Sequence, residues 1–162
     1  MIRNPFITLF IITCILFSMQ SCDKARVFDE NKDITNDAWY YKNRLLFDIN
    51  IEDTAKIYNF YVNLRLSKEY YYCNLFLILH QTNPGKKEQS ERKEFTFADE
   101  TGKWLGRGLG DILDYQIPVY QNIKFHEKGI YHFELEQNMR DDTLMHIKSA
   151  GIRIEDAVMV RE

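Results

Sequence analysis

Apolar and polar residues alternate with a period of two along most of this chain, a pattern typical of β-strands buried on one face. The clearest case runs from Tyr58 to Leu66, where every second side chain is apolar. A helix could not place these two sets of side chains on opposite faces, whereas a strand does. The segment Cys73 to Leu79 is apolar on both faces, which indicates a central strand. The pattern predicts further strands at 45–51, around Phe95 and Phe97, and at 119–125, 130–137 and 157–161.

Turn-rich segments such as Asp99 to Gly102 separate the predicted strands, and no sustained helical period lies between them. Single helical turns are expected only near Gly110 to Leu113 and Leu144 to Lys148. Strands rich in Tyr, Phe and Ile that follow one another without long helices favour an all-β fold. We therefore predict a single β-sandwich, of jelly-roll or immunoglobulin-like type, with about seven to eight antiparallel strands.

The first residues have the layout of an export signal. Arg3 is the one charged residue before position 22, and the apolar run from Phe6 to Phe17 follows it. A helix that spans a bilayer needs about 20 apolar residues, whereas the apolar part of a signal peptide needs only about 7 to 15. Ser21 then precedes Cys22, and a small residue before a cysteine is what lipoprotein signal peptidases require.

Lipidation explains why a cysteine stands at position 22. The thiol of Cys22 can form a thioether with diacylglycerol, and the amine freed by cleavage can accept another acyl chain. Two acyl chains give stable membrane anchoring where one gives marginal binding. An ordinary signal peptide that is cut nearby is the alternative. We expect a lipoprotein signal peptide at residues 1–21, a lipidated N-terminus and polar tether at 22–38, and a β-sandwich domain at 39–162.

Charge and cysteine content narrow the range of partners and bonds. The sequence has 21 Lys and Arg against 24 Asp and Glu, so it lacks the predominance of positive charge that a nucleic-acid-binding face needs. Nucleic acid is therefore not an expected partner. Cys14 leaves with the signal and Cys22 carries the lipid, so Cys73 has no partner for a disulfide within the mature protein. Because Cys73 begins an apolar segment, we expect a buried and unreactive thiol.

No arrangement of residues in the sequence predicts a reaction. Glu134 and Glu136 share a strand face, but the alternation turns that face toward solvent, so we assign them no acid or base role. The Gly-x-Ser-x-Gly motif, which positions the nucleophilic serine of many hydrolases, is missing from the sequence. We predict no enzyme activity, no metal and no cofactor. The four histidines are far apart in sequence and lack the paired spacing of a zinc site: His80, His126, His132 and His146.

A run of closely spaced glycines from Gly106 to Gly110 is the most unusual segment. It lacks the lysine of a phosphate-binding loop. In a structural interpretation, the glycines allow positive φ and close backbone approach, so that Trp104 can pack. The alternative is a partner-binding loop formed by Trp104, Arg107 and Asp111, because an exposed arginine is a favoured interface residue.

Two aromatic triplets, Trp39-Tyr40-Tyr41 and Tyr70-Tyr71-Tyr72, are further candidates for binding. Exposed rings could stack on sugars or become buried in a protein partner. In the alternative interpretation these rings simply cover the core.

Several short segments, taken in order along the sequence, resemble the gliding-motility lipoprotein family GldH. The similarity runs through nearly the whole mature protein. The segments are Cys22-Asp23-Lys24, Arg26-Val27-Phe28-Asp29, Trp104-Leu105-Gly106 with Gly108 and Gly110-Asp111-Ile112, Gly129-Ile130-Tyr131, Glu136-Gln137 and Met139-Arg140.

The resemblance implies a non-catalytic lipoprotein of the cell envelope, expected in the outer membrane and facing the periplasm. It implies a role in gliding, with other gliding-motility lipoproteins and the type IX secretion machinery, which exports surface adhesins, as partners. The lipid on Cys22 is the one functional position that it transfers. Sequons resembling those O-glycosylated in this bacterial group imply sugars on Thr54 and Thr143. A carbohydrate-binding envelope lipoprotein that uses exposed aromatics is the alternative function.

Overall fold

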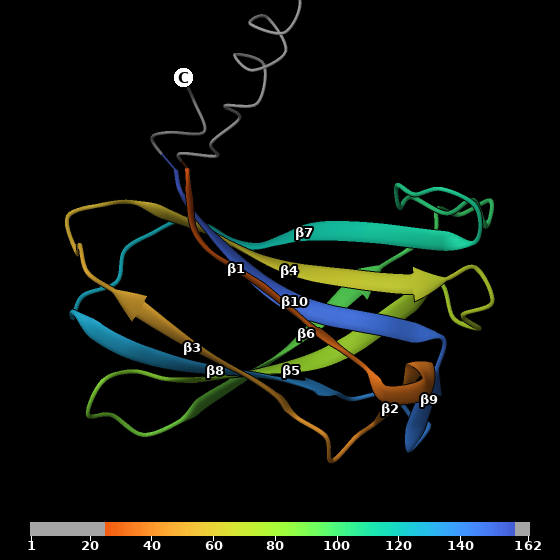
Figure 1. Ribbon diagram of the computed structural model, residues 1–162, viewed down its shortest axis with the longest axis horizontal. Coiled ribbons are helices and arrows are strands. Elements are labelled where there is room, and N and C mark those ends of the chain that lie inside the picture. The colour runs from red at the N-terminus through yellow and green to blue at the C-terminus, as the bar shows by residue number, and fades with distance from the viewer. Residues whose placement is uncertain (1–24, 158–162) are drawn as a thin grey trace, which may run out of the picture.

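Two four-stranded antiparallel sheets face each other in the computed structural model, which describes residues 25–157 (Figure 1). Sheet I consists, in spatial order, of β1 (Arg26–Asp33), β10 (Ile147–Asp156), β4 (Tyr58–Ser67) and β7 (Ile112–Ile123). Sheet II consists of β3 (Leu45–Ile51), β8 (Gly129–Gln137), β5 (Asn74–Thr82) and β6 (Gln89–Thr96). A 3-10 turn, η1 (Thr35–Asp37), precedes a small sheet of β2 (Ala38–Tyr40) and β9 (Thr143–Met145). The predicted all-β sandwich is confirmed, with ten strands among residues 25–157 instead of the expected seven to eight.

The core lies between the two sheets and is filled by the alternating apolar residues. In β4 the inward side chains are the ones that the alternation predicts: Tyr58, Phe60, Val62, Leu64 and Leu66. Aromatic rings meet edge to face, so that the Phe125 ring lies 5.3 Å from Tyr58 and 4.8 Å from Tyr131 between centroids. Burial of one large apolar side chain contributes about 1.5–3 kcal/mol, which makes this core the main source of stability.

The sandwich has two different ends. Ala25 and Ala157 lie at the first, which we call the terminal end: Asp156 donates its backbone N–H to Ala25, and Ala157 donates to Ile57. The loops 52–57, 83–88 and 124–128 close the same end. The opposite, distal end carries the loops 68–73, 97–111 and 138–142 together with the small sheet (Figure 1). Among residues 25–157, no helix is long and apolar enough to cross a membrane.

The N-terminal tether is shorter than predicted. Residues 22–24 lie outside the described part of the protein, but Arg26–Asp33 forms β1, which pairs along its length with β10. The polar composition of this segment is typical of an edge strand, which has a neighbour on one side only. The folded domain therefore begins before Trp39, where the sequence placed its boundary.

The C-terminal part of the fold also differs from the prediction. Leu144 to Lys148, expected as a helical turn, contains β9 and the beginning of β10. The strand expected at 157–161 is not confirmed, since Ala157 lies in a turn and the later residues are outside the described range. β7 begins seven residues before the predicted strand at 119–125, directly after the turn at Gly110. The last described strand, β10, is internal to sheet I and was missed.

Candidate functional site

The aromatic triplet 70–72 is divided between the core and the surface. Tyr70 is only 3% exposed and donates its hydroxyl to the carbonyl of Asn74 at 3.0 Å. Burial raises the pKa of the Tyr70 hydroxyl, so this group stays protonated. Tyr71 is 89% exposed, whereas Tyr72 is half-buried and donates to Asp141 Oδ2 at 2.6 Å. One tyrosine thus holds the loop on the core and leaves the next available to a partner.

Two hollows at the distal end share Tyr72. The first, of about 230 Å³, we call the tyrosine hollow; it is lined by Glu69, Tyr70, Tyr71, Tyr72, Asp141, Thr143, Leu144, Met145 and His146. The second, of about 440 Å³, we call the arginine hollow; it is lined by Tyr72, Phe76, Arg92, Asn138, Met139 and Arg140. The Tyr72 ring also meets Tyr71 edge to face, with centroids 5.2 Å apart. The triplet therefore joins two concave surfaces that differ in chemistry.

Exposed apolar side chains gather at the same end of the sandwich. Leu109 is 94% exposed and Leu105 is 57% exposed, both in the loop 97–111, and Met145 is half exposed in β9. Tyr40 at the end of β2 is also exposed. Val27 and Ile130 are exposed toward the terminal end, but the exposed apolar residues are more numerous at the distal end, and a partner that covers them gains the free energy of their burial. The distal end is therefore the candidate docking surface.

The glycine segment has the structural role that its composition suggests. A Cβ at Gly106 would collide with the ring of Tyr115, and one at Gly108 would collide with the carbonyl oxygen of Ile112. Gly110 has a φ of 67°, in the left-handed region. The backbone groups of Arg107 and Asp114 exchange two hydrogen bonds, which fold the loop back onto the start of β7.

The three residues of the predicted partner-binding loop all lie near the distal end but have different surroundings. Trp104 is half-buried against the core, and its backbone pairs with Ala98. Arg107 is exposed and lines a shallow hollow of about 440 Å³ beside Pro118. Asp111 is exposed, and its carbonyl accepts a hydrogen bond from the backbone of Lys68. The side chains of Arg107 and Asp111 both remain accessible for binding.

The other aromatic triplet supplies little surface for binding. Trp39 is 1% exposed and donates its Nε1–H to the carbonyl of Asn43 at 2.8 Å. Tyr40 and Tyr41 stand outside it, with their rings edge to face. In this triplet the largest ring, that of Trp39, covers the core.

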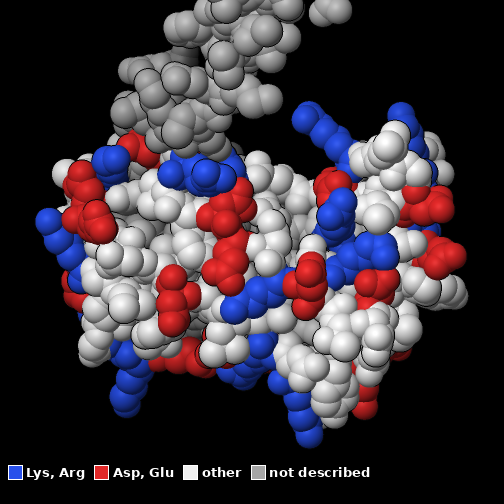
Figure 2. Space-filling view, viewed as in Figure 1, with Lys and Arg blue, Asp and Glu red and all other residues white. Residues whose placement is uncertain are grey.

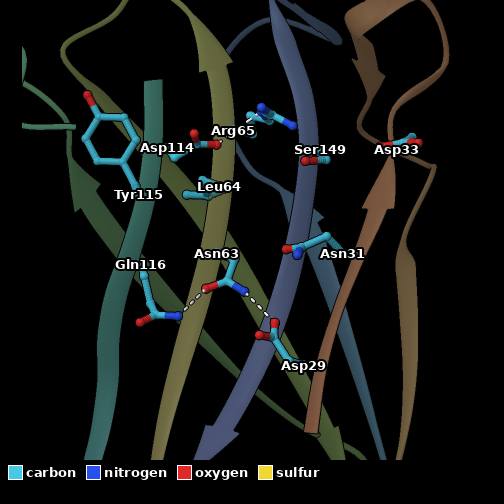
Figure 3. Close-up of a pocket in the computed structure, with 10 residues that line it drawn as sticks. All are labelled: Asp29, Asn31, Asp33, Asn63, Leu64, Arg65, Asp114, Tyr115, Gln116 and Ser149. Carbon is cyan, nitrogen blue, oxygen red and sulfur yellow. Dashed lines mark hydrogen bonds and ion pairs between the residues drawn. The ribbon is translucent and has the colours of Figure 1, made fainter. Parts of the chain in front are cut away.

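The outer face of sheet I carries a polar groove of about 330 Å³ (Figure 3). Asn63 lies at its centre, donating to Asp29 Oδ1 at 3.1 Å and accepting from Gln116 Nε2 at 3.3 Å. Gly151 pairs with Asn63 in the neighbouring strand, and the Asn31 side chain and the Glu30 carbonyl of β1 lie directly against it. Tyr115 points away from the groove in Figure 3, and its hydroxyl donates to the carbonyl of Phe97. The groove thus offers amides and carboxylates but no ring from that tyrosine.

The outer face of sheet II carries a polar cluster around a buried histidine, His80, and the sequence did not predict this cluster. His80 contacts Glu136 Oε2 through Nε2 at 2.9 Å and the hydroxyl of Ser90 through Nδ1 at 2.8 Å. Arg44 lies 2.8 Å from Glu136 and 3.2 Å from Glu134. The two glutamates face outward as predicted, yet they are half-buried and neutralised by the arginine. Among residues 25–157, no group of three or more His, Cys, Asp or Glu is arranged to hold a metal ion.

Three further predicted positions have different outcomes. Cys73 is exposed, so the prediction of a buried thiol was wrong; the residue lies one position before β5, in the loop that leads into it. Thr54 is half-buried in the loop 52–57, and Thr143 is exposed at the start of β9. Glycosylation of either threonine stays a prediction. Cys22 lies outside the described residues.

Charges of both signs are interleaved across the face shown in Figure 2. Ion pairs also join neighbouring strands of the sheets, such as Arg65 with Asp114 at 3.1 Å. Exposed pairs of this kind contribute at most about 1 kcal/mol each. They contribute little to stability and keep the sheet faces hydrated.

Comparison with known proteins supplies the family. The family model for the GldH lipoprotein matches residues 26–154. A protein of Christiangramia forsetii named "Gliding motility lipoprotein GldH homolog" is 36% identical over 161 residues, covering 94% of this chain and 97% of the relative. The "Gliding motility lipoprotein GldH" of Flavobacterium johnsoniae is 34% identical over 142 residues, covering 83% of this chain and 87% of the relative. The chain belongs to the GldH lipoprotein family.

Proposed function

We propose that the protein is a non-catalytic cell-envelope lipoprotein that supports gliding motility and the type IX secretion of surface adhesins. Lipid on Cys22 holds it in the outer membrane, facing the periplasm. Its sandwich presents the distal end to other gliding-motility lipoproteins or to proteins of the secretion machinery. Family membership supports the gliding-motility role.

The position of the exposed apolar side chains is the observation that carries this proposal. The backbone leads toward Cys22 from Ala25, which lies at the terminal end. Tyr71 and Leu109 are exposed at the other end. A lipid anchor at position 22 would leave the distal end accessible to partners. Large apolar side chains that stand in water are stabilised when a protein partner covers them.

The surroundings of the polar clusters support a non-catalytic role. Arg44 forms an ion pair with the carboxylate of Glu136. His80 is 5% exposed, so access of a substrate to its imidazole is restricted. A general acid or base must reach the proton that it transfers. The cluster is better suited to hold β5, β6 and β8 together.

Replacement of the anchor residue tests the lipoprotein part of the proposal. In cells fed a labelled fatty acid, the wild-type protein should carry the label and sediment with membranes. Cys22→Ala should lose the label and either remain uncleaved or be released, because the acyl chains are its strong anchor. Secretion of type IX cargo should fall in the same mutant. Unchanged labelling of Cys22→Ala would contradict the proposal.

The groove on sheet I supports carbohydrate binding as a second candidate function. Its amides and carboxylates match the hydroxyl groups of a sugar. A glycan array probed with the purified protein tests this function. Binding that is lost in Asn63→Ala would favour it over the docking role.

A further inference from the structure

Arg92 is held in place at the centre of the arginine hollow. Its guanidinium carbon lies 3.8 Å from the centroid of the Phe76 ring, and its Nε–H donates to Asn138 Oδ1 at 2.8 Å. A cation above a ring face and a directed hydrogen bond both restrict this flexible side chain. Within residues 25–157, neither Nη nitrogen of Arg92 has a hydrogen-bond or ion-pair partner. The two Nη groups therefore remain available to a ligand.

The floor of the hollow is apolar and fixed by the backbone. The Phe76 carbonyl accepts the backbone N–H of Asn138 at 2.8 Å, and the Phe76 N–H donates to Met139 Sδ at 3.3 Å. These two contacts keep the segment that leaves β8 against β5. Phe76 and Met139 thus form a surface of one ring and one thioether beneath Arg92. Thioether side chains adapt to ligands of different shape.

The lining of the hollow carries positive charge. Arg140 supplies a second exposed guanidinium, and among residues 25–157 no carboxylate lines the hollow. Glu94 and Asp141, close in sequence to the lining residues, form hydrogen bonds with neutral donors and, within the same range, no ion pair with either arginine. Glu94 accepts the amide of Asn74 at 2.7 Å, and Asp141 accepts the hydroxyl of Tyr72 at 2.6 Å. An anionic group would therefore find two cations.

We propose that the arginine hollow binds a carboxylate of a partner protein, from an Asp or Glu side chain or from the partner's C-terminus. The carboxylate accepts two hydrogen bonds from the Nη groups of Arg92, the paired geometry that guanidinium and carboxylate favour. A neighbouring apolar residue of the partner packs on Phe76 and Met139. Beyond Tyr72, the tyrosine hollow can take the next apolar side chain of the same segment.

The location of the hollow favours a protein over a lipid. It lies toward the end opposite Ala25, and the segment that leads to the anchor leaves from the terminal end. This inference rests on the proposed docking function of the distal end, but it adds the chemistry of the partner.

Binding selection with the full-length lipidated protein in detergent micelles tests the inference. The probes are two bead libraries of random octapeptides, one with free C-terminal carboxylates and one amidated, and vesicles of phosphatidylglycerol. We expect enrichment of Asp and Glu in the amidated library, or binding confined to the free carboxylates. The first result assigns the hollow to a side chain and the second to a peptide terminus.

Variants of the protein then locate the binding. Arg92→Gln should weaken the selected peptides about tenfold, because a hydrogen bond to a charged group is lost. Arg92→Lys keeps the cation but not the planar fork and should weaken them less. Arg26→Gln, on sheet I, is the matched control and should change nothing. Selection without carboxylate enrichment, binding unaffected by Arg92→Gln, or vesicle binding that peptides do not compete would overturn the inference.

A complementation experiment separates failure of this inference from failure of the proposed function. In the bacterium that makes the protein, a deletion strain should lose secretion of type IX cargo and regain it with the wild-type gene. The double variant Arg92→Gln, Arg140→Gln should fail to restore secretion although it accumulates normally. If the wild-type gene is dispensable for secretion, the proposed function fails. If the double variant restores secretion fully, only the carboxylate site fails.

Discussion

The two ends of the sandwich are built in opposite ways. At the terminal end, short polar loops are tied to each other and to the last strand: Lys56 lies 3.0 Å from Asp156, and Lys86 lies 2.6 Å from Glu127. A hydrogen bond to Asp156 raises the pKa of Lys56, which keeps that amine charged. At the distal end one loop, 97–111, is longer than these, and apolar side chains such as Leu109 stand in water.

This difference shows how a small domain separates stability from binding. Polar loops that satisfy one another present little surface that a partner could cover. Exposed apolar loops do present such a surface. They bind a partner well only if the backbone beneath them is fixed, because ordering a loop on binding costs affinity. In this protein the buried Tyr70 and the folded-back glycine segment supply that support.

The core that joins the two ends should be the most sensitive to mutation. Phe60 is fully buried, and its ring lies 5.0 Å from that of Phe133. Phe60→Asp should lower the free energy of unfolding by about 4 kcal/mol or more, because it buries an unpaired carboxylate and removes a ring. Urea denaturation followed by circular dichroism measures the change.

Asn59→Asp is the control for this prediction. The Asn59 side chain points outward, and its Oδ1 accepts the backbone N–H of Asn122 at 3.0 Å, which an aspartate can also do. Its stability should stay within about 0.5 kcal/mol of wild type. Equal stability of both variants would mean that β4 does not have the assigned inward face.

Gly108→Val should weaken the distal end selectively. The new side chain would collide with the carbonyl of Ile112, and the expected loss is about 3 kcal/mol. Hydrogen exchange should rise in the loop 97–111 and remain slow at 52–57. Arg107→Ala is the control, because only its backbone makes the hydrogen bonds with Asp114. A stable Gly108→Val protein would show that the loop can move without cost.

Acid should loosen the distal loop before it affects the core. Hydrogen bonds from the Thr101 hydroxyl and from the backbone of Lys103 and Thr101 lower the pKa of Asp99. The stabilisation is complete above the unfolded pKa of about 3.9 and is lost as the pH falls through the lower folded value. Amide exchange at Thr101 and Lys103 should increase in that range. In Asp99→Asn this pH dependence should disappear; its persistence would assign the effect to another group.

Tyr71→Ser should have the smallest effect on stability and the clearest effect on docking. The ring is almost fully exposed, so the melting temperature should change little. Secretion of type IX cargo should nevertheless fall, since a partner would lose a buried aromatic anchor. Lys86→Gln at the terminal end is the matched surface control and should leave secretion intact. If Tyr71→Ser and Lys86→Gln affect secretion equally, the two ends do not differ in their role in docking.

Alternation predicted the strands that have one face in the core. β4 and β8 repeat apolar residues at every second position, and their buried residues are the predicted ones. β1 escaped detection because it is an edge strand whose exposed residues are polar at nearly every position. In β10 the small residues Ser149 to Gly151 interrupt the apolar period although they are buried in the sheet.

The candidate site could be predicted only in part. The tyrosine triplet was visible in the sequence, but which ring is buried depends on how the loop packs on the core. The arginine hollow combines Arg92 with Phe76 and Asn138, and no local spacing indicates that they meet. Their contact depends on the pairing of β5 with both β6 and β8, a long-range property of the fold.

The first and last strands of the domain are neighbours, and this pairing sets the order in which the domain can be completed. β10 lies between β1 and β4, so β1 cannot pair with the rest of sheet I until β10 is available. Contacts between residues so far apart in sequence form slowly, because a long loop must close before they are made. A polypeptide still being moved through a membrane, N-terminus first, therefore remains unfolded and transportable until its last segment has crossed. A truncated protein that ends before Ile147 would retain every other strand of sheet I and still be unable to fold.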